Sequence, residues 1–125
     1  MPKLHSLILL LALSLAACGD DFVGPQYNVM LHIQGTVTNA ATGAPIEGAR
    51  VRQLFEFDFE VLTNAEGRYT LSQLKESCHS SSSVGVVAIA EGYYYFSDLG
   101  AGGEGLVSAK CTEDTQIVNI RLTPR

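Results

Sequence analysis

The sequence predicts an all-β sandwich of about seven short strands. Two observations lead to this fold class: segments in which apolar and polar residues alternate recur along the chain, and turn residues separate them. Helix is expected only as a single turn at residues 72–77. The chain has 125 residues, 46% of them hydrophobic, which suits one small domain with one core.

The first half of the predicted sandwich contains two alternating segments. From Val29 to Val37 every second position is mostly apolar, which indicates a half-buried strand, and the Gly and Pro of residues 42–45 then indicate a turn. A longer alternation starts at Ala49. We expect its apolar side in the core and its charged side in solvent, with Gln53 marking a bulge or a strand end. The apolar side contains Val51, Phe55, Phe57 and Phe59, and the charged side contains Arg50, Arg52, Glu56, Asp58 and Glu60.

The second half contains three further strand signals. The loop at residues 64–67 ends in a glycine and is expected to close a short hairpin, with Tyr69 and Leu71 pointing inward. Residues 84–90 are apolar at every position but one, which predicts a strand covered on both faces. Residues 116–122 alternate again. Their expected inward side chains are Val118, Ile120 and Leu122.

The N-terminal residues have the pattern of a secretory signal. One basic residue, Lys3, precedes an apolar run of about a dozen residues, which is shorter than the roughly 20 that a membrane-spanning helix needs. The run ends in Leu-Ala-Ala-Cys at residues 15–18, which resembles the lipobox of bacterial lipoproteins. This resemblance implies cleavage before Cys18 and acylation of its thiol. An ordinary secretory signal cleaved after Ala17 is the alternative.

The predicted organisation is a signal peptide at 1–17, a lipidated tether at 18–27 and a β-sandwich domain at 28–125. In the lipoproteins that the chain resembles, an acidic residue directly after the cysteine often retains the protein at the inner membrane. Gly19 stands there, which favours the outer membrane. Cleavage removes Lys3 and no acidic residue, leaving 7 basic and 13 acidic side chains. Nucleic acid and anionic membrane surfaces are therefore poor partners.

The cysteine count fits an exported protein. The chain has three cysteines, and if Cys18 carries lipid, Cys78 and Cys111 remain as a pair. Disulfides persist in oxidising compartments, so we expect this pair to be bonded. Two buried free thiols are the alternative.

Four segments, in this order, resemble the signatures of carboxypeptidase regulatory-like domains. They are Gly-Thr-Val-Thr with Thr-Gly-Ala-Pro-Ile-Glu-Gly-Ala-Arg-Val at 35–38 and 42–51, Thr-Asn-Ala-Glu-Gly-Arg-Tyr-Thr-Leu at 63–71, Ala-Glu-Gly-Tyr at 90–93 and Val-Asn-Ile-Arg-Leu at 118–122. The resemblance covers residues 31–122. It implies a prealbumin-like (immunoglobulin-like), seven-stranded sandwich related in shape to transthyretin. These signatures consist mostly of folding residues, so they specify a scaffold and not a function.

The sequence shows no set of residues for nucleotide or metal binding. Gly100, Gly102 and Gly105 have the spacing of a dinucleotide-binding loop, but that loop needs a βαβ unit around it, so a surface loop is expected instead. The histidines after the signal, His32 and His79, are too few and too far apart in sequence for a zinc site. We expect no cofactor, no metal and no nucleotide.

The densest aromatic run is Tyr93-Tyr94-Tyr95-Phe96. In a strand, alternate rings face opposite sides, so two are expected in the core and two outward. Exposed tyrosines can stack on sugar rings or anchor a protein interface. The alternative is that they only cover the edge of the sheet.

These features predict a non-enzymatic, membrane-anchored binding or structural module of the bacterial cell envelope, with an envelope protein or a glycan as its partner. Carbohydrate binding through Tyr93, Tyr94 and Tyr95 is a narrower alternative. A transthyretin-like hydrolase is a third and disfavoured one, because such enzymes end in Tyr-Arg-Gly-Ser and this chain ends in Leu-Thr-Pro-Arg. The sequence also has no Gly-x-Ser-x-Gly turn that would present a nucleophilic serine.

Overall fold

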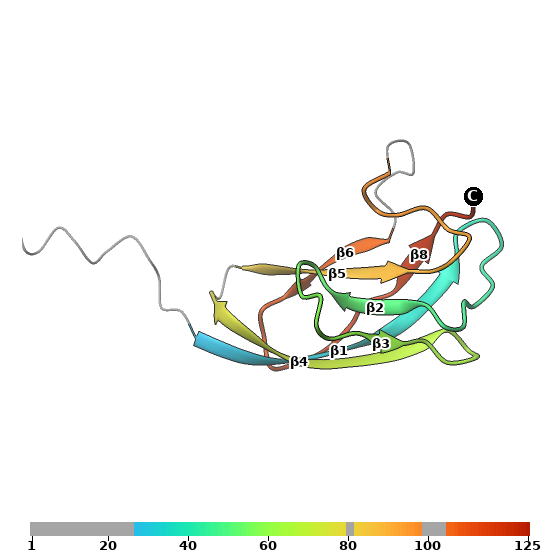
Figure 1. Cartoon of the computed structure of the whole chain (residues 1–125). Coiled ribbons are helices and arrows are strands. Elements are labelled where there is room, and N and C mark those ends of the chain that lie inside the picture. The colour runs from blue at the N-terminus through green and yellow to red at the C-terminus, as the bar shows by residue number, and fades with distance from the viewer. Residues whose placement is uncertain (1–26, 80–81, 99–104) are drawn as a thin grey trace, which may run out of the picture.

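A computed structural model describes residues 27–79, 82–98 and 105–125, and these ranges form two packed β-sheets without a helix (Figure 1). The strands are β1 (Tyr27–Asn39), β2 (Arg50–Gln53), β3 (Val61–Leu62), β4 (Arg68–Cys78), β5 (Ser83–Ile89), β6 (Leu106–Lys110), β7 (Thr115–Ile117) and β8 (Ile120–Leu122). The first sheet contains β4, β1, β7 and β8, and the second has the order β3-β2-β5-β6. The predicted all-β sandwich is confirmed, with eight described strands where about seven were expected.

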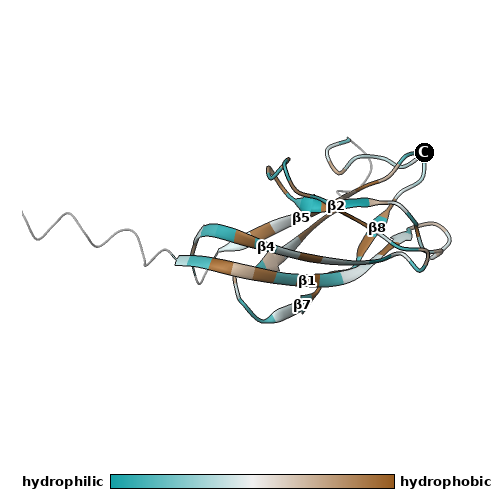
Figure 2. Ribbon diagram, turned by 60° about the horizontal axis from the view of Figure 1, so that its bottom comes forward, coloured by the Kyte–Doolittle hydropathy of each residue, from teal (hydrophilic) through white to brown (hydrophobic). Residues whose placement is uncertain are grey.

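β1 is the central strand of the first sheet. β4 pairs with it in antiparallel orientation over residues 27–36, while the other edge pairs in parallel with β7 at 32–34 and with β8 at 37–39. Apolar and polar residues alternate along β1, as Figure 2 shows. This alternation buries one face of the strand against the second sheet and leaves the other facing outward.

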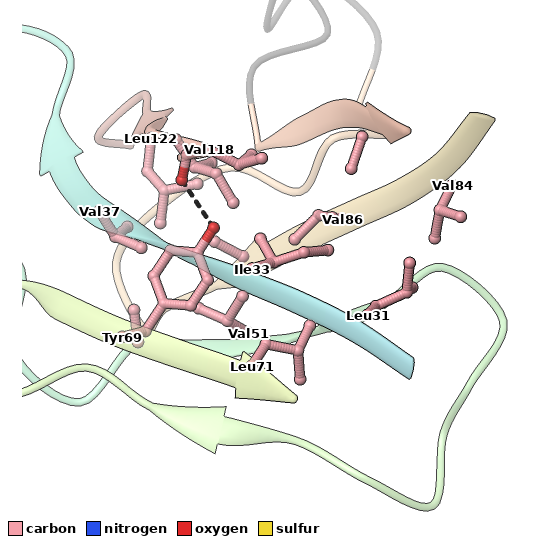
Figure 3. Packing of buried hydrophobic residues seen from close by; sticks show 14 of the residues in the cluster. Leu31, Ile33, Val37, Val51, Tyr69, Leu71, Val84, Val86, Val118 and Leu122 are labelled. Atoms are coloured by element: carbon pink, nitrogen blue, oxygen red, sulfur yellow. Dashed lines mark hydrogen bonds between the residues drawn. The ribbon is translucent and has the colours of Figure 1, made fainter. Parts of the chain in front are cut away.

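The core lies between the two sheets and is filled by alternate residues of their strands (Figure 3). The inward orientation expected for Tyr69, Leu71 and Val118 is confirmed, as is that of Ile120 and Leu122. The Tyr69 hydroxyl donates a 2.6 Å hydrogen bond to the carbonyl of Val118, and burial raises the pKa of this phenol. The bond satisfies a polar group that would otherwise be costly to bury.

The predicted disulfide between Cys78 and Cys111 is present, which excludes two free thiols. Cys78 is the last residue of β4, and Cys111 directly follows β6. The bond therefore links the first sheet to the second. Both cysteines are buried, and their Cα atoms are 5.9 Å apart.

The prediction that three phenylalanines of residues 49–60 lie in the core is wrong. β2 ends at Gln53, and Phe55, Phe57 and Phe59 follow in a loop with 77%, 71% and 41% of their surface exposed. Gln53 keeps the inward position and is only 1% exposed. The pairing of β2 with β5 stops at Gln53, although β5 itself continues to Ser83. Phe55 has a left-handed φ of 68°, so the chain turns away from β5 and the alternation beyond this point no longer follows a strand. The acidic residues Glu56, Asp58 and Glu60 lie exposed in the same loop and not on a strand face.

Three other local predictions need correction. Residues 72–77 form no helical turn but continue β4, because each pairs with a residue of β1 or lies between paired ones. The loop at 64–67 does not close a hairpin: β3 pairs with β2, and β4 pairs with β1, so the loop carries the chain between sheets. Gly67 nevertheless has the expected left-handed φ of 73°. Residues 116–122 contribute to two strands, β7 and β8, and not to one.

Replacing Phe57 with Ser should change the free energy of unfolding by less than about 1 kcal/mol. Its ring is mostly exposed, and the substitution removes a stack with the Arg52 guanidinium at 4.6 Å, an interaction of about 0.5–1 kcal/mol at exposed sites. Urea denaturation measures the change. Leu71→Ala is the matched core variant and should lose about 2–5 kcal/mol. Similar losses for the two variants would contradict this description of the loop.

Candidate binding groove

A groove of about 660 Å³ opens at the end of the sandwich where β5 finishes. Three parts of the chain meet there: the start of β2, the segment after β5, and the chain end at Arg125. The residues that line it are Gly48, Arg50, Ile89, Ala90, Glu91, Gly92, Tyr93, Tyr95 and Arg125. Ligand pockets typically measure roughly 300–1,000 Å³, so this groove has the size of a binding site.

Backbone hydrogen bonds fix the tyrosine segment against the chain end. Tyr93 forms a β-bridge with Pro124, and the Tyr94 N–H donates to the carbonyl of Thr123 at 2.9 Å. The Arg125 N–H in turn donates to the carbonyl of Gly92 at 3.0 Å. Gly92 has a φ of 86°, which lets the chain turn directly after β5. These backbone contacts fix the tyrosine segment and the chain end to each other along the groove.

The sequence predicted that the four aromatic residues would alternate in a strand. They lie instead in this turn segment. Tyr93 packs against the core and accepts a 3.3 Å hydrogen bond from the Asn39 side-chain amide. Phe96 is also partly buried, whereas Tyr94 and Tyr95 are 41% and 42% exposed. Two rings do face outward, but they are neighbours. Of the three tyrosines singled out in the sequence, Tyr93 and Tyr95 line the groove.

Charged groups of both signs lie beside these rings. Arg50 enters from the outer face of β2, and Glu91 belongs to the turn. The Arg125 guanidinium lies 5.4 Å from the centre of the Tyr94 ring, 3.9 Å from the carboxylate of Asp98, and donates to the Tyr93 carbonyl. Hydrogen-bond donors and acceptors therefore lie beside aromatic rings in this groove, with two arginines in its lining and the carboxylates of Glu91 and Asp98 near them.

Sequence reasoning did not identify the charged residues of the groove. Arg50 and Arg125 are 75 positions apart, and no spacing pattern joins them. They meet because Arg50 pairs with Ile89 at the end of β5, and the turn that follows is bonded to the chain end. The partial signal in the sequence was the aromatic run itself.

The histidines form no catalytic arrangement with the described serines. The His32 Nδ1 lies 3.3 Å from the Ser72 Oγ, but the two residues are directly opposite in the β1–β4 register and their hydrogen bond is exposed on the sheet. Strand pairing accounts for their proximity. The main-chain N–H of His79 donates to the Ser82 hydroxyl after the end of β4. Within residues 27–79, 82–98 and 105–125, no three His, Cys, Asp or Glu side chains gather as metal ligands would.

Several sequence predictions fall on residues that the structure does not describe. Cys18 and the signal are among them, as are Gly100 and Gly102 of the glycine pattern. Gly105 immediately precedes β6, so the pattern leads into a strand and not into the helix that a dinucleotide site requires. Within the described part of the chain, no helix has the length and hydropathy needed to cross a bilayer.

No protein-family model matches the sequence, and no curated protein matches it. Among solved structures, it is similar to the C-terminal domain of a shaft pilin from Lactobacillus rhamnosus GG, with 10% identity and a TM-score of 0.49 over 77% of this chain and 98% of that one. A DUF3823 family protein from Bacteroides uniformis is 18% identical, with a TM-score of 0.49 over 76% of this chain and 43% of that one. Catechol 1,2-dioxygenase from Pseudomonas arvilla C-1 is 15% identical, with a TM-score of 0.49 over 84% and 55%.

Proposed function

We propose that the protein is a non-enzymatic module of the bacterial cell envelope and that a lipid on Cys18 anchors it there. Gly19 after the cysteine favours the outer membrane over the inner membrane as the place of anchoring. Two observations support export and anchoring. The signal-like segment ends in a lipobox-like Leu-Ala-Ala-Cys, and Cys78 and Cys111 are bonded, which is typical of oxidising compartments. The disulfide leaves Cys18 as the one cysteine of the chain that is free for acylation.

A binding role is supported above all by the groove at Tyr93 and Tyr95. Among the described residues, its lining contains no Ser, Thr, Cys or His that could act as a nucleophile with its base, whereas it does contain aromatic rings and charged hydrogen-bonding groups. The His32–Ser72 pair lies on β1 and β4 and outside this lining. A binding module therefore accounts for these side chains better than a hydrolase does.

The ligand that best fits the groove is a neutral saccharide. A sugar ring has an apolar face that can stack on the exposed Tyr95 ring, and its hydroxyl groups can pair with Arg50 and Glu91. The side chains of opposite charge also make the groove a poor match for a strongly anionic or cationic ligand.

Anchoring can be tested by replacing Cys18 with Ala. The unsubstituted protein should fractionate with membranes and require detergent for extraction, because two or more acyl chains give stable attachment. The Cys18→Ala variant should lose this attachment, whereas a Cys78→Ala, Cys111→Ala double variant should keep it. Mass spectrometry of the purified N-terminus reports acylation directly, and an unmodified Cys18 thiol would contradict the anchor.

Saccharide binding can be tested on a glycan array with the mature protein. Tyr95→Ala should weaken binding about two- to tenfold, because an aromatic contact contributes about 0.5–1.5 kcal/mol and about 1.4 kcal/mol corresponds to one factor of ten in affinity. Tyr27→Ala is the matched control: this ring is equally exposed, but it lies at the start of β1 and does not line the groove. The saccharide proposal would be rejected if the unsubstituted protein bound no glycan or if both variants lost binding equally.

A further inference from the structure

The loop at residues 54–60, between β2 and β3, exposes apolar surface that the groove does not use. We call it the phenylalanine loop. Phe55 and Phe57 are the two most exposed aromatic side chains of the described structure, and Phe59 of the same loop is 41% exposed. Clustered exposed apolar side chains of this size typically mark an interaction surface, because folding alone would bury them.

The loop is held in a defined shape that presents these rings. The Leu54 N–H donates to the carbonyl of Gly85 at 2.8 Å, and the Glu56 N–H donates to that of Gln53 at 3.2 Å. Phe55 has a φ of 68°, a left-handed conformation that is unfavourable for a bulky residue. Backbone conformations of this kind concentrate at functional positions. The Arg52 guanidinium stacks on the Phe57 ring from the adjacent strand.

The phenylalanine loop lies toward the end of the sandwich where β1 begins. Leu54, Phe55 and Lys75 line a common hollow of about 340 Å³, and Lys75 pairs with Val29, two residues after the start of β1. The groove is at the opposite end, where Asn39 at the end of β1 bonds to Tyr93. In Figure 1 the loop leaves β2 on the side where β1 starts, and the C-terminus lies on the other side.

The length of the tether limits how far this end can lie from a membrane. Cys18 and Tyr27 are nine positions apart, so even a fully extended chain spans at most about 30 Å between them. The groove lies further away, by the length of β1 from Val29 to Asn39, or roughly 30 Å at about 3.3 Å per residue. A lipid on Cys18 therefore brings the phenylalanine loop within reach of the bilayer more readily than it brings the groove.

We propose that the phenylalanine loop docks on the lipid surface to which Cys18 attaches the chain, with the Phe55 and Phe57 rings at the boundary between headgroups and acyl chains. This inference rests on the proposed lipid anchor. Phe side chains of segments that lie on a membrane insert at that boundary, and a short tether keeps the surface at high local concentration. Glu56, Asp58 and Glu60 alternate with the rings, so the loop matches a zwitterionic surface and is repelled by an anionic one.

A tryptophan probe can detect this docking, because the sequence contains no Trp. The variant is the mature chain from Cys18 onward with the substitution Phe57→Trp. Its Cys18 thiol is coupled to a lipid with a maleimide headgroup, which is mixed into phosphatidylcholine vesicles. The disulfide keeps the other two cysteines out of the reaction. We expect the emission to shift to shorter wavelength and to be quenched by lipids brominated in their acyl chains. Tyr94→Trp, at the groove end, is the matched control and should show neither change.

The charge of the loop gives a second readout. Adding phosphatidylglycerol at low ionic strength should reduce the quenching of the Phe57→Trp probe, and added salt should restore it, since salt screens repulsion between surface charges. Equal quenching of the Phe57→Trp and Tyr94→Trp probes would overturn docking. So would an emission shift of the Phe57→Trp probe that occurs only after another protein is added. Chemical coupling replaces acylation here, so this result is independent of whether mass spectrometry finds lipid on Cys18 in the cell.

Discussion

Replacing both Cys78 and Cys111 with Ala is expected to lower the free energy of unfolding by about 4 kcal/mol. The disulfide joins residues 33 positions apart, and in the chain-entropy model a closed loop of this length restricts the unfolded chain by about that amount. In the folded protein it also connects the end of β4 to the end of β6, so the variant loses the covalent link between the two sheets at this end. Urea denaturation without reductant measures the difference.

Reduction provides the control for this prediction. Dithiothreitol should lower the stability of the unsubstituted protein to about that of the Cys78→Ala, Cys111→Ala variant and should leave the variant unchanged. If the double substitution cost less than about 1 kcal/mol, the disulfide would not be the main constraint on the unfolded chain.

Replacing Gly35 with Ala should cost about 3 kcal/mol or more, at the upper end of what overpacking costs in a core. A Cβ on Gly35 would overlap the carbonyl group of Val118. Val118 cannot move freely, because its carbonyl accepts the Tyr69 hydroxyl and its N–H donates to the carbonyl of Gln34 at 2.8 Å. The substitution therefore disturbs the junction of β1 with the segment between β7 and β8. Thermal and urea denaturation should both report the loss.

Gly43→Ala separates this steric effect from the conformational cost of losing a glycine. Gly43 has a left-handed φ of 75°, and no described atom lies within 4 Å of where its Cβ would be. Its substitution should cost only the strain of that conformation, about 1–2 kcal/mol. If Gly35→Ala were no more destabilising than Gly43→Ala, the close approach to Val118 would not be limiting.

The sequence predicted strands correctly where alternating apolar and polar residues belong to a strand that is paired along its length. Residues 29–37 and the inward side chains Tyr69 and Leu71 were predicted correctly, because buried apolar residues there recur with the period of a paired strand. The same period continues past Gln53 into the phenylalanine loop, and Gln53 alone marks the end of the strand, as one of the two outcomes that the sequence left open for it. The chain leaves β5 after Leu54, where Phe55 has a left-handed φ of 68°, and the alternation does not predict that conformation.

In β4 the opposite error occurred, because a true strand was predicted to be a helical turn. Its second half places Leu74 outward, at 47% exposure, and Lys75 inward beside the hollow at the loop. Hydrophobicity therefore no longer follows the faces of the sheet, and a strand could not be recognised from residues 72–77 alone. The groove was predictable only through its tyrosines, because its arginines come together through sheet topology and not through sequence spacing.

The central position of β1 has a mechanical consequence. Under the proposed anchor and the proposed groove ligand, a membrane holding Cys18 would pull on β1 at Tyr27, and the ligand would pull near Asn39, which bonds to Tyr93. This tension runs along the strand axis. Hydrogen bonds to β4, β7 and β8 lie across that axis, so they are loaded together in shear and do not open one after another. In the proposed function, the pairing of β1 on both sides would make the domain a stiff link between the membrane and the ligand.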